Sequence, residues 1–347
     1  MSQLRFFDST LRDGSHAIKH SLTKETITAF CKKVDGSGVE VVIVGHGNGL
    51  GASSLQTGLS SLRDDVMLTT ARDNLKKTSL GVFLIPGYGT IQDDLAPALE
   101  IGVDIVCVGA HCTEANVTRQ HIEYVRGKGK NVHGVLMMYH MTDTNTLLQE
   151  ARKMQKYGAQ GVIIMDSAGA STPSLVKKTI QVLKENLSVA VGFHPHNNMG
   201  MAVGNAYVAY ESGVDIIDAT VRGFGAGAGN CQLEAFVALL QKEGIETKVD
   251  LYRLLEASDE IIAPVWPAGG ALSAASVISG MSGVFSSFAT HVHSAAKQFD
   301  LDPKDIFIEL GKRKVVGGQE DMVVDVAMNL AQQRKNSLES DMLSALL

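Results

Sequence analysis

The sequence lacks any Asp, Glu, Lys or Arg between Glu260 and Lys297, a gap of 36 residues in a chain of 347. A gap of that length raises the question of a membrane helix, which needs about 20 consecutive apolar residues. The stretch contains Pro264, Pro267, four glycines and many serines, and its purely apolar runs are far shorter than that. The charge-free stretch (residues 261–296) therefore predicts no membrane span, and we expect no membrane partner.

Cysteine is scarce, and no two cysteines form a CxxC pair. Four cysteines in so long a chain do not make a disulfide framework, so we expect reduced thiols. Blocks of like charge are also missing, because 31 basic and 37 acidic residues are spread along the chain and give a net charge of -6. This excludes a cationic face that neutralises phosphates, and we expect no nucleic-acid partner.

The first ten residues, MSQLRFFDST, lack the basic segment, apolar segment and small-residue cleavage site of a secretory signal. We therefore expect a cytoplasmic protein.

Short apolar, β-branched runs recur along the chain at spacings of roughly 25 to 40 residues, the length of a βα unit. Such runs suit strands that are covered by helices on one side and face a barrel interior on the other. Helical patterns lie between them, as at 23–38, 173–187 and 202–213. The runs span residues 4–8, 39–44, 80–85, 103–109, 132–138, 161–166, 190–194 and 214–220.

Eight βα units predict an α/β fold of the (β/α)8 TIM-barrel type, whose active site lies at the C-terminal ends of the strands. A doubly wound sheet is the rival fold, but no GxGxxG motif follows the first run. Beyond residue 250 only helical patterns remain, as at 303–314 and 319–335. We expect a catalytic barrel over 1–250, a helical communication or dimerisation domain over 251–335, and a polar tail over 336–347.

Metal-ligating residue types occur at two of the predicted strand ends. His194 and His196 close the seventh run, and side chains two residues apart on a strand face the same side. The first run leads into Asp8-Ser9-Thr10-Leu11-Arg12-Asp13-Gly14-Ser15-His16, which supplies a carboxylate. In a closed barrel the first and seventh strands are two places apart, so these side chains converge.

A plainer interpretation treats the histidines as part of a polar loop, and Arg12 with Asp13 as a solvated ion pair. The position of both motifs at the catalytic rim favours a site. Two imidazoles and a carboxylate suit non-haem iron, but also Mn²⁺ or Mg²⁺ acting as a Lewis acid, so ligand type alone does not choose the metal.

Several motifs together resemble one known group of enzymes. DSTLRDG near the N-terminus, HxHN at the seventh run and GAGAGN (225–230) look like the metal-dependent pyruvate aldolase and lyase superfamily, which also holds HMG-CoA lyase and isopropylmalate synthase. Within that superfamily, TLRDGSHA (10–17), HGNGLGASS (46–54) and GKRKVVGGQEDMVVDVA (311–327) are similar to 4-hydroxy-2-oxovalerate aldolases. The resemblance covers nearly the whole chain.

The resemblance implies a class II aldolase that cleaves a 4-hydroxy-2-oxo acid, such as 4-hydroxy-2-oxopentanoate, to pyruvate and a short aldehyde. Mn²⁺ is the usual metal of the family, and Mg²⁺ or Co²⁺ are alternatives. The ion would be held beside the 2-oxo acid by Asp13, His194 and His196. Arg12 would add a second positive charge at the developing enolate. His16 would take the proton of the C4 hydroxyl. Ser167 matches a serine that contacts substrate in the family.

The chain departs from the family at Phe285, where the aldolases carry a tyrosine that helps to place the aldehyde end. Removing one oriented hydroxyl costs on the order of 1 kcal/mol. We therefore expect Phe285 to contact substrate and to alter aldehyde specificity. The charge-free stretch, which contains Phe285, is expected to pack on the barrel rim and to line a passage for the aldehyde.

Two alternatives remain open from the sequence: a Claisen-type condensing enzyme or acyl-CoA lyase of the same superfamily, and a non-catalytic assembly subunit. No separate basic loop for an adenine nucleotide supports CoA chemistry. Family members commonly pair with an acylating aldehyde dehydrogenase through the C-terminal domain. The resemblance thus implies that dehydrogenase as a partner, and we expect an oligomer.

Overall fold

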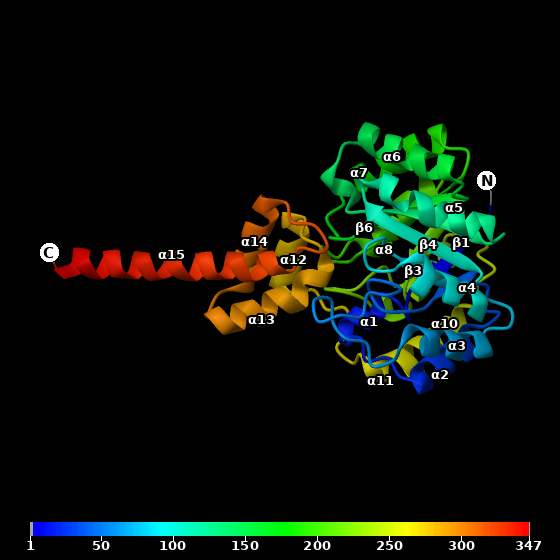
Figure 1. Ribbon diagram of the computed structural model, residues 1–347, viewed down its shortest axis with the longest axis horizontal. Helices are drawn as coiled ribbons and strands as arrows, with labels where there is room; N and C mark the ends of the chain where they lie inside the picture. Colours follow the sequence, from blue (N-terminus) through cyan, green and yellow to red (C-terminus); the bar gives the residue numbers. More distant parts are fainter. Residues whose placement is uncertain (1–2, 347) are drawn as a thin grey trace.

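The computed structural model describes residues 3–346 and contains a closed barrel of eight parallel strands in the order β1 to β8 (Figure 1). Each apolar run predicted as a strand overlaps one of them, which confirms the TIM-barrel fold. The strands are β1 Arg5–Asp8, β2 Val41–Ile43, β3 Ser79–Leu84, β4 Ile105–His111, β5 Asn131–Met137, β6 Gly161–Asp166, β7 Ala190–Pro195 and β8 Ile216–Ala219.

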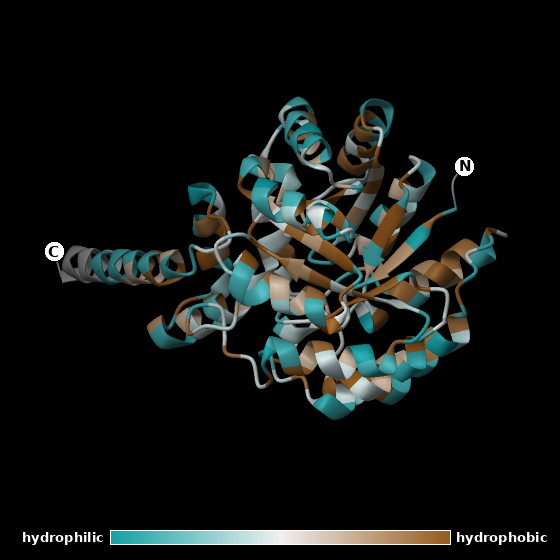
Figure 2. Ribbon diagram, turned by 45° about the vertical axis from the view of Figure 1, so that its right-hand side comes forward, coloured by the Kyte–Doolittle hydropathy of each residue, from teal (hydrophilic) through white to brown (hydrophobic). Residues whose placement is uncertain are grey.

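The strands are buried on both faces, as their β-branched composition predicts. Phe7, Ile43 and Ile163 point into the barrel and belong to one apolar cluster, whereas Phe6 and Val42 face the helices and belong to another. Figure 2 shows hydrophobic residues along the central strands and hydrophilic residues on the outer faces of the helices. This two-sided packing holds the C-terminal strand ends at fixed positions.

Helices connect the strands and cover the barrel. They are α1 Gly14–Ala17, α2 Lys24–Val34, α3 Asp64–Asn74, α4 Ala96–Ile101, α5 Arg119–Gly127, α6 Thr144–Tyr157, α7 Pro173–Asn186, α8 Ala202–Glu211 and α9 Leu233–Lys242. Beyond the last strand follow α10 Leu251–Glu256, the π-helical turn Ala257–Ile262, α11 Ala263–Val265, α12 Ala274–Ser282, α13 Ala289–Phe299, α14 Pro303–Arg313 and α15 Asp321–Leu346.

The helix predicted over 23–38 ends at Val34, four residues early. Asp35 leaves the helix and its Oδ1 accepts hydrogen bonds from the backbone N–H groups of residues 76, 77 and 78. Gly36 and Gly38 follow with φ of 73° and 93°. These left-handed glycines turn the chain into β2, which a continued helix would prevent.

The C-terminal helices build a second apolar core. Val292, Phe307 and Val326, from α13, α14 and α15, pack together in it, and the core begins at Ala275. Leu254 and Ile262 belong instead to the core of the barrel, so packing places the boundary between the two bodies after Ile262. The boundary expected at residue 250 lies before that point.

The segment expected to be a polar tail from residue 336 onward continues α15 as far as Leu346. It contains no proline or glycine to stop the helix. Figure 1 shows α15 projecting away from the rest of the molecule.

The four cysteines are buried and unpaired, as expected. Within the described residues, none of the helices is both long enough and apolar enough to cross a bilayer.

Candidate metal centre and active site

Arg12 and Asp13 lie in the tight turn that follows β1, where both backbone N–H groups donate to the carbonyl of Ser9. Nη1 of Arg12 lies 2.7 Å from Oδ1 of Asp13. The side chains of both residues are buried, with 4% and 3% of their area exposed. The ion pair considered for this motif therefore exists, but it is enclosed at the barrel mouth and is not a solvated surface pair.

His194 lies in β7 and His196 directly follows its last residue, and the centroids of the two rings are 5.2 Å apart. Asp13, His194 and His196 each offer a ligand atom, and these atoms all lie within 4.8 Å of one another. All three residues are buried. The structure thus brings together the three residues predicted as metal ligands.

Electrostatics keep Asp13 and His196 in the protonation state that a cation needs. Burial opposes the charge of Asp13, but the Arg12 guanidinium and the nearby imidazoles outweigh it and hold the pKa of Asp13 far below its usual range. Burial lowers the pKa of His196 to about 3. The site is therefore an ionised carboxylate beside a neutral imidazole at neutral pH.

Nε2 of His194 and Nδ1 of His196 are buried and have no hydrogen-bond partner within the described part of the chain. Buried polar atoms nearly always have a partner, so atoms of this kind indicate a missing ligand. One anionic oxygen and two imidazole nitrogens form a donor set that divalent cations accept. The residues present therefore fit a divalent metal site.

Asp218 is a functional candidate that sequence reasoning missed. Its Oδ2 lies 2.9 Å from Nδ1 of His194, and its Oδ1 accepts a hydrogen bond of 2.7 Å from the hydroxyl of Ser9. A carboxylate at Nδ1 fixes the orientation of the imidazole and leaves Nε2 for a metal. The available signal was the carboxylate near the end of the eighth run, because β7 and β8 are neighbours in the barrel.

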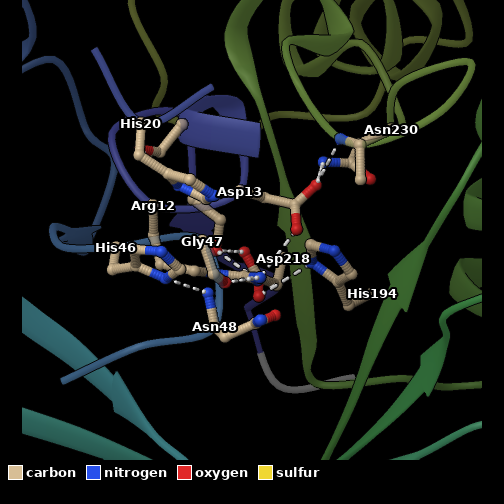
Figure 3. Close-up of polar contacts among 12 residues, drawn as sticks. Arg12, Asp13, His20, His46, Gly47, Asn48, His194, Asp218 and Asn230 are labelled. Atoms are coloured by element: carbon tan, nitrogen blue, oxygen red, sulfur yellow. Dashed lines mark hydrogen bonds and ion pairs between the residues drawn. The ribbon is translucent and has the colours of Figure 1, made fainter. Parts of the chain in front are cut away.

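The glycine-rich segment 225–230 supports Asp13. Oδ2 of Asp13 accepts hydrogen bonds from Nδ2 of Asn230 at 2.6 Å and from the backbone N–H of Ala226 at 3.2 Å (Figure 3). A Cβ at Gly225 would lie 2.6 Å from Oδ2 of Asp13, so only glycine fits there. Asn is a common residue at the start of a helix, but α9 begins after Gln232, and the Asn230 side chain turns inward to Asp13.

Arg12 is held by contacts on several sides. Nη1 also donates to the carbonyl of Gly47 at 3.3 Å, and the guanidinium lies 4.9 Å from the centroid of the Phe83 ring. Its Nε is buried without a hydrogen-bond partner among the described residues. The side chain thus offers a fixed positive charge and an unused donor at the barrel mouth.

His16 lies beside this charge in a cluster of imidazoles. Its ring packs edge-on against His20 at 5.1 Å, and His20 stacks on His46 at 3.7 Å. A Cβ at Gly47 would lie 2.4 Å from the His16 ring, which explains the glycine at that position of the HGNG motif. His20 and His46 were not singled out from the sequence, although His46 opens the HGNGLGASS motif that carried the resemblance and His20 follows the TLRDGSHA motif by three residues.

Burial lowers the pKa of His16 to about 4 and that of His46 to about 4. Both imidazoles are therefore neutral near pH 7. A neutral imidazole can accept a proton, which is the state that a general base needs.

Phe285 and Ser167 are placed differently with respect to the site. An inner cavity at the barrel mouth is lined by Phe285 together with Arg12, Asp13, His16, Phe83 and His196, among others. Ser167 is buried, but it is not part of that lining, and its Oγ accepts a hydrogen bond from the backbone N–H of Met138. The structure brings Phe285 to the predicted site and leaves Ser167 outside the lining of the inner cavity.

A larger outer cavity of about 470 Å³ lies between the barrel mouth and the helical domain. It shares His16, Ala226 and Ser287 with the inner cavity. Residues of the charge-free stretch form about half of its lining. The charge-free stretch, residues 261–296, thus forms one wall of this cavity.

Two protein families match this chain, one over the barrel and one over the helical domain. Residues 3–261 match the HMGL-like family, and residues 271–332 match the DmpG-like communication domain. The first match spans the barrel and the second spans the helical core that begins at Ala275. The carboxyl transferase domain of Rhizobium etli pyruvate carboxylase shares the fold, with a TM-score of 0.80 at 16% identity over 96% of this chain and 61% of that one.

Curated relatives match over nearly the full length. A 4-hydroxy-2-oxovalerate aldolase from Pectobacterium atrosepticum is 51% identical over 96% of this chain and 97% of its own. A 4-hydroxy-2-oxovalerate aldolase from Spirochaeta aurantia is 49% identical over 93% of this chain and 95% of its own. The chain therefore belongs to the HMGL-like family and, within it, to the family of 4-hydroxy-2-oxovalerate aldolases, which are carbon–carbon lyases.

Proposed function

We propose that this chain cleaves a short 4-hydroxy-2-oxo acid, such as 4-hydroxy-2-oxopentanoate, to pyruvate and an aldehyde. The observation that carries the proposal is the buried cluster of Asp13, His194 and His196 beside Arg12 and His16 at the barrel mouth. These groups supply the two things that retro-aldol cleavage needs, which are positive charge at the 2-oxo group and a base at the C4 hydroxyl.

Asp13, His194 and His196 would hold a divalent cation, for which we propose Mn²⁺, with Mg²⁺ or Co²⁺ as alternatives. Such an ion, when bound, supplies Lewis-acid stabilisation of the negative charge that develops on the 2-oxo oxygen. Asp218 and Asn230 serve this set indirectly, because they orient His194 and Asp13.

Arg12 binds and orients the acid end of the substrate in this proposal. Its guanidinium stays charged at any working pH, and its contacts with Asp13 and Gly47 fix its position before substrate arrives. A preorganised charge of this kind stabilises the enolate without a cost of reorganisation during the reaction.

His16 takes the proton from the C4 hydroxyl as the C3–C4 bond breaks. The electron pair of that bond moves toward the 2-oxo group, the C4 carbon leaves as the aldehyde, and return of one proton to C3 of the resulting enolate completes pyruvate. His16 lines both the inner and the outer cavity, which supports its role as the base. Its lowered pKa keeps it ready to accept a proton at neutral pH.

The aldehyde end of the substrate would face apolar side chains of the inner cavity. Phe83, Ile85 and Phe285 line that cavity next to the charged groups. This combination of a polar acid-binding end and an apolar far end fits a short alkyl aldehyde. Ser167 remains a proposed contact of the substrate carboxylate, made after a small shift from its bond to Met138.

We also propose that the helical domain binds an acylating aldehyde dehydrogenase, that the chain forms oligomers and that it works in the cytoplasm. The match of residues 271–332 to a communication domain supports such an association. Co-expression with an acylating aldehyde dehydrogenase of the source organism, followed by gel filtration, tests it: co-elution supports the partnership and separate elution contradicts it.

Pyruvate release from 4-hydroxy-2-oxopentanoate tests the enzymatic proposal. Purified protein is assayed as it is, with added Mn²⁺, and after treatment with a chelator. We expect release only with metal and no requirement for CoA. Turnover of an acyl-CoA thioester in place of the hydroxy acid would instead support the acyl-CoA lyase interpretation. Bound metal without turnover of either substrate would support a non-catalytic subunit.

A further inference from the structure

The outer cavity is the larger of the two cavities at the barrel mouth, and the two share His16, Ala226 and Ser287 in their linings. A molecule that reaches the inner site by this path therefore passes the His16 imidazole. The path is walled by the segment around α1 on one side and by the charge-free stretch on the other.

The lining of the outer cavity contains one Asp, Glu, Lys or Arg residue, and this is Lys19. The helical-domain wall contributes serines, Thr290 and two histidines but no carboxylate and no further ammonium or guanidinium. The chain as a whole has a net charge of -6 and would repel an anion. The cavity is thus a region without negative charge on an otherwise anionic molecule.

The backbone presents Lys19 in an unusual way. Lys19 and His20 are consecutive residues with left-handed φ of 51° and 59°, a conformation that non-glycine residues seldom adopt. The turn is closed by hydrogen bonds from Lys19 N to His16 O at 3.2 Å and from His20 N to Ser15 O at 2.7 Å. The same turn therefore places the base and the ammonium group at one cavity.

Lys19 is exposed, and no carboxylate among the side chains that the structure describes forms an ion pair with it. An ammonium group with no protein counter-charge, set in a cleft with few other charges, focuses its field into that cleft. Strained backbone that persists at a functional site is a reason to look for a role of the side chain it presents.

We propose that Lys19 draws the carboxylate of the 2-oxo acid into the outer cavity and so favours anionic substrates at the step of entry. The inference rests on the proposed function, and it assigns Lys19 a part in substrate capture that is separate from bond cleavage. The uncharged wall of residues 261–296 assists by presenting no carboxylate to the incoming anion. Neither the charge of Lys19 nor the lack of carboxylates in the wall affects the entry of the neutral aldehyde.

The test compares Lys19→Gln and Lys19→Arg with the full-length wild-type enzyme loaded with Mn²⁺, in cleavage of 4-hydroxy-2-oxopentanoate over a series of KCl concentrations. At low salt we expect Lys19→Gln to lower kcat/KM for the acid about threefold to tenfold, with kcat nearly unchanged. Lys19→Arg keeps the charge and should restore kcat/KM. Added salt should reduce kcat/KM of the wild type more steeply than that of Lys19→Gln, because salt screens the attraction.

Lys314→Gln is the matched control. Lys314 is also an exposed lysine with left-handed φ, of 54°, but it ends α14 and is not part of the cavity lining. We expect it to leave kcat/KM and its salt dependence unchanged. In the reverse direction the KM for pyruvate should rise in Lys19→Gln while the KM for the aldehyde stays the same, which a general distortion of the site would not produce.

The proposal is overturned if Lys19→Gln retains the wild-type kcat/KM and salt dependence at low ionic strength, or if pyruvate and aldehyde are affected equally. Both outcomes leave the proposed aldolase function standing, because wild-type cleavage is measured in the same experiment. Absence of metal-dependent cleavage in the wild type would overturn the proposed function itself.

Discussion

Nδ1 of His194 and Oδ2 of Asp218 lie 2.9 Å apart on neighbouring strands β7 and β8. The contact leaves Nε2 of His194 directed away from Asp218 and without a partner among the described residues. Because Asp218 also accepts a hydrogen bond from Ser9, its own orientation is fixed. The Asp218 carboxylate therefore favours the His194 tautomer that carries its proton on Nδ1, and Nε2 is left to bind a metal.

Asp218→Asn should weaken metal binding about 10- to 100-fold, because the amide keeps the shape but loses the charge that orients and polarises His194. Titration of Mn²⁺ into the metal-free protein by calorimetry measures the change in Kd. Asp104→Asn is the control, since Asp104 pairs with Arg72, remote from the metal ligands. An unchanged Kd for Mn²⁺ in Asp218→Asn would contradict the role of Asp218 in orienting His194.

Gly47→Ala should displace the base without disturbing the metal ligands. The added Cβ would lie 2.4 Å from the His16 ring, so the imidazole must move. A misplacement of about 1 Å costs about 100-fold in rate, and we expect kcat to fall by up to that factor while the Kd for Mn²⁺ is retained. Gly127→Ala, where a Cβ meets nothing within 4 Å, is the matched control. Wild-type kcat in Gly47→Ala would argue against His16 as the base.

Asp8 predicts a pH dependence of stability. Burial raises the pKa of this carboxyl from its usual value of 3.8 to about 7. Between these pH values the folded chain holds a proton that the unfolded chain has lost, so the free energy of unfolding falls as the pH rises through that window. Asp8→Asn removes the ionisation and keeps an acceptor for the N–H of Thr10.

We therefore expect Asp8→Asn to be more stable than the wild type at pH 8 by on the order of 4 kcal/mol, with little difference at pH 4. Urea unfolding followed by circular dichroism at both pH values measures this. A stability difference that does not depend on pH would contradict the raised pKa.

Phe285→Tyr should alter how the enzyme discriminates among aldehydes. Phe285 lines the inner cavity, and a Cβ at Gly317 would lie 3.0 Å from its ring, so the position of the ring is defined by close packing. A new hydroxyl that finds a polar partner contributes about 1 kcal/mol, which is about fivefold in relative kcat/KM. Addition of pyruvate to a series of aldehydes of increasing length, with product stereochemistry, gives the readout. Identical aldehyde profiles for the two proteins would show that residue 285 does not contact the aldehyde end.

The sequence was sufficient to predict the barrel because each strand carries its own local signal, a short β-branched run that ends near polar residues. It also predicted that Asp13, His194 and His196 converge, because strand order in a closed barrel relates distant segments. It did not predict Asp218, whose role depends on register: β7 and β8 pair Phe193 with Ile217, so the next residues, His194 and Asp218, are neighbours. Nor did it predict the direction of the Asn230 side chain, which points to Asp13 and not to a helix end.

The stacked pair of His20 and His46 was missed for a related reason. Their contact joins the turn after α1 to the loop after β2, and no spacing rule connects those segments. The charge-free stretch is unusual in the sequence alone, but only its tertiary contacts bring it to the barrel mouth, where it lines the outer cavity.

The central claim is that Asp13, His194 and His196 hold one divalent cation on which carbon–carbon cleavage depends. The most direct measurement is pyruvate release from 4-hydroxy-2-oxopentanoate as a function of Mn²⁺ content, determined on the same samples of wild-type protein and of His196→Ala. We predict that activity rises in proportion to bound metal up to one ion per chain in the wild type, and that His196→Ala neither retains the ion nor releases pyruvate. Full pyruvate release from metal-free wild-type protein would contradict the account.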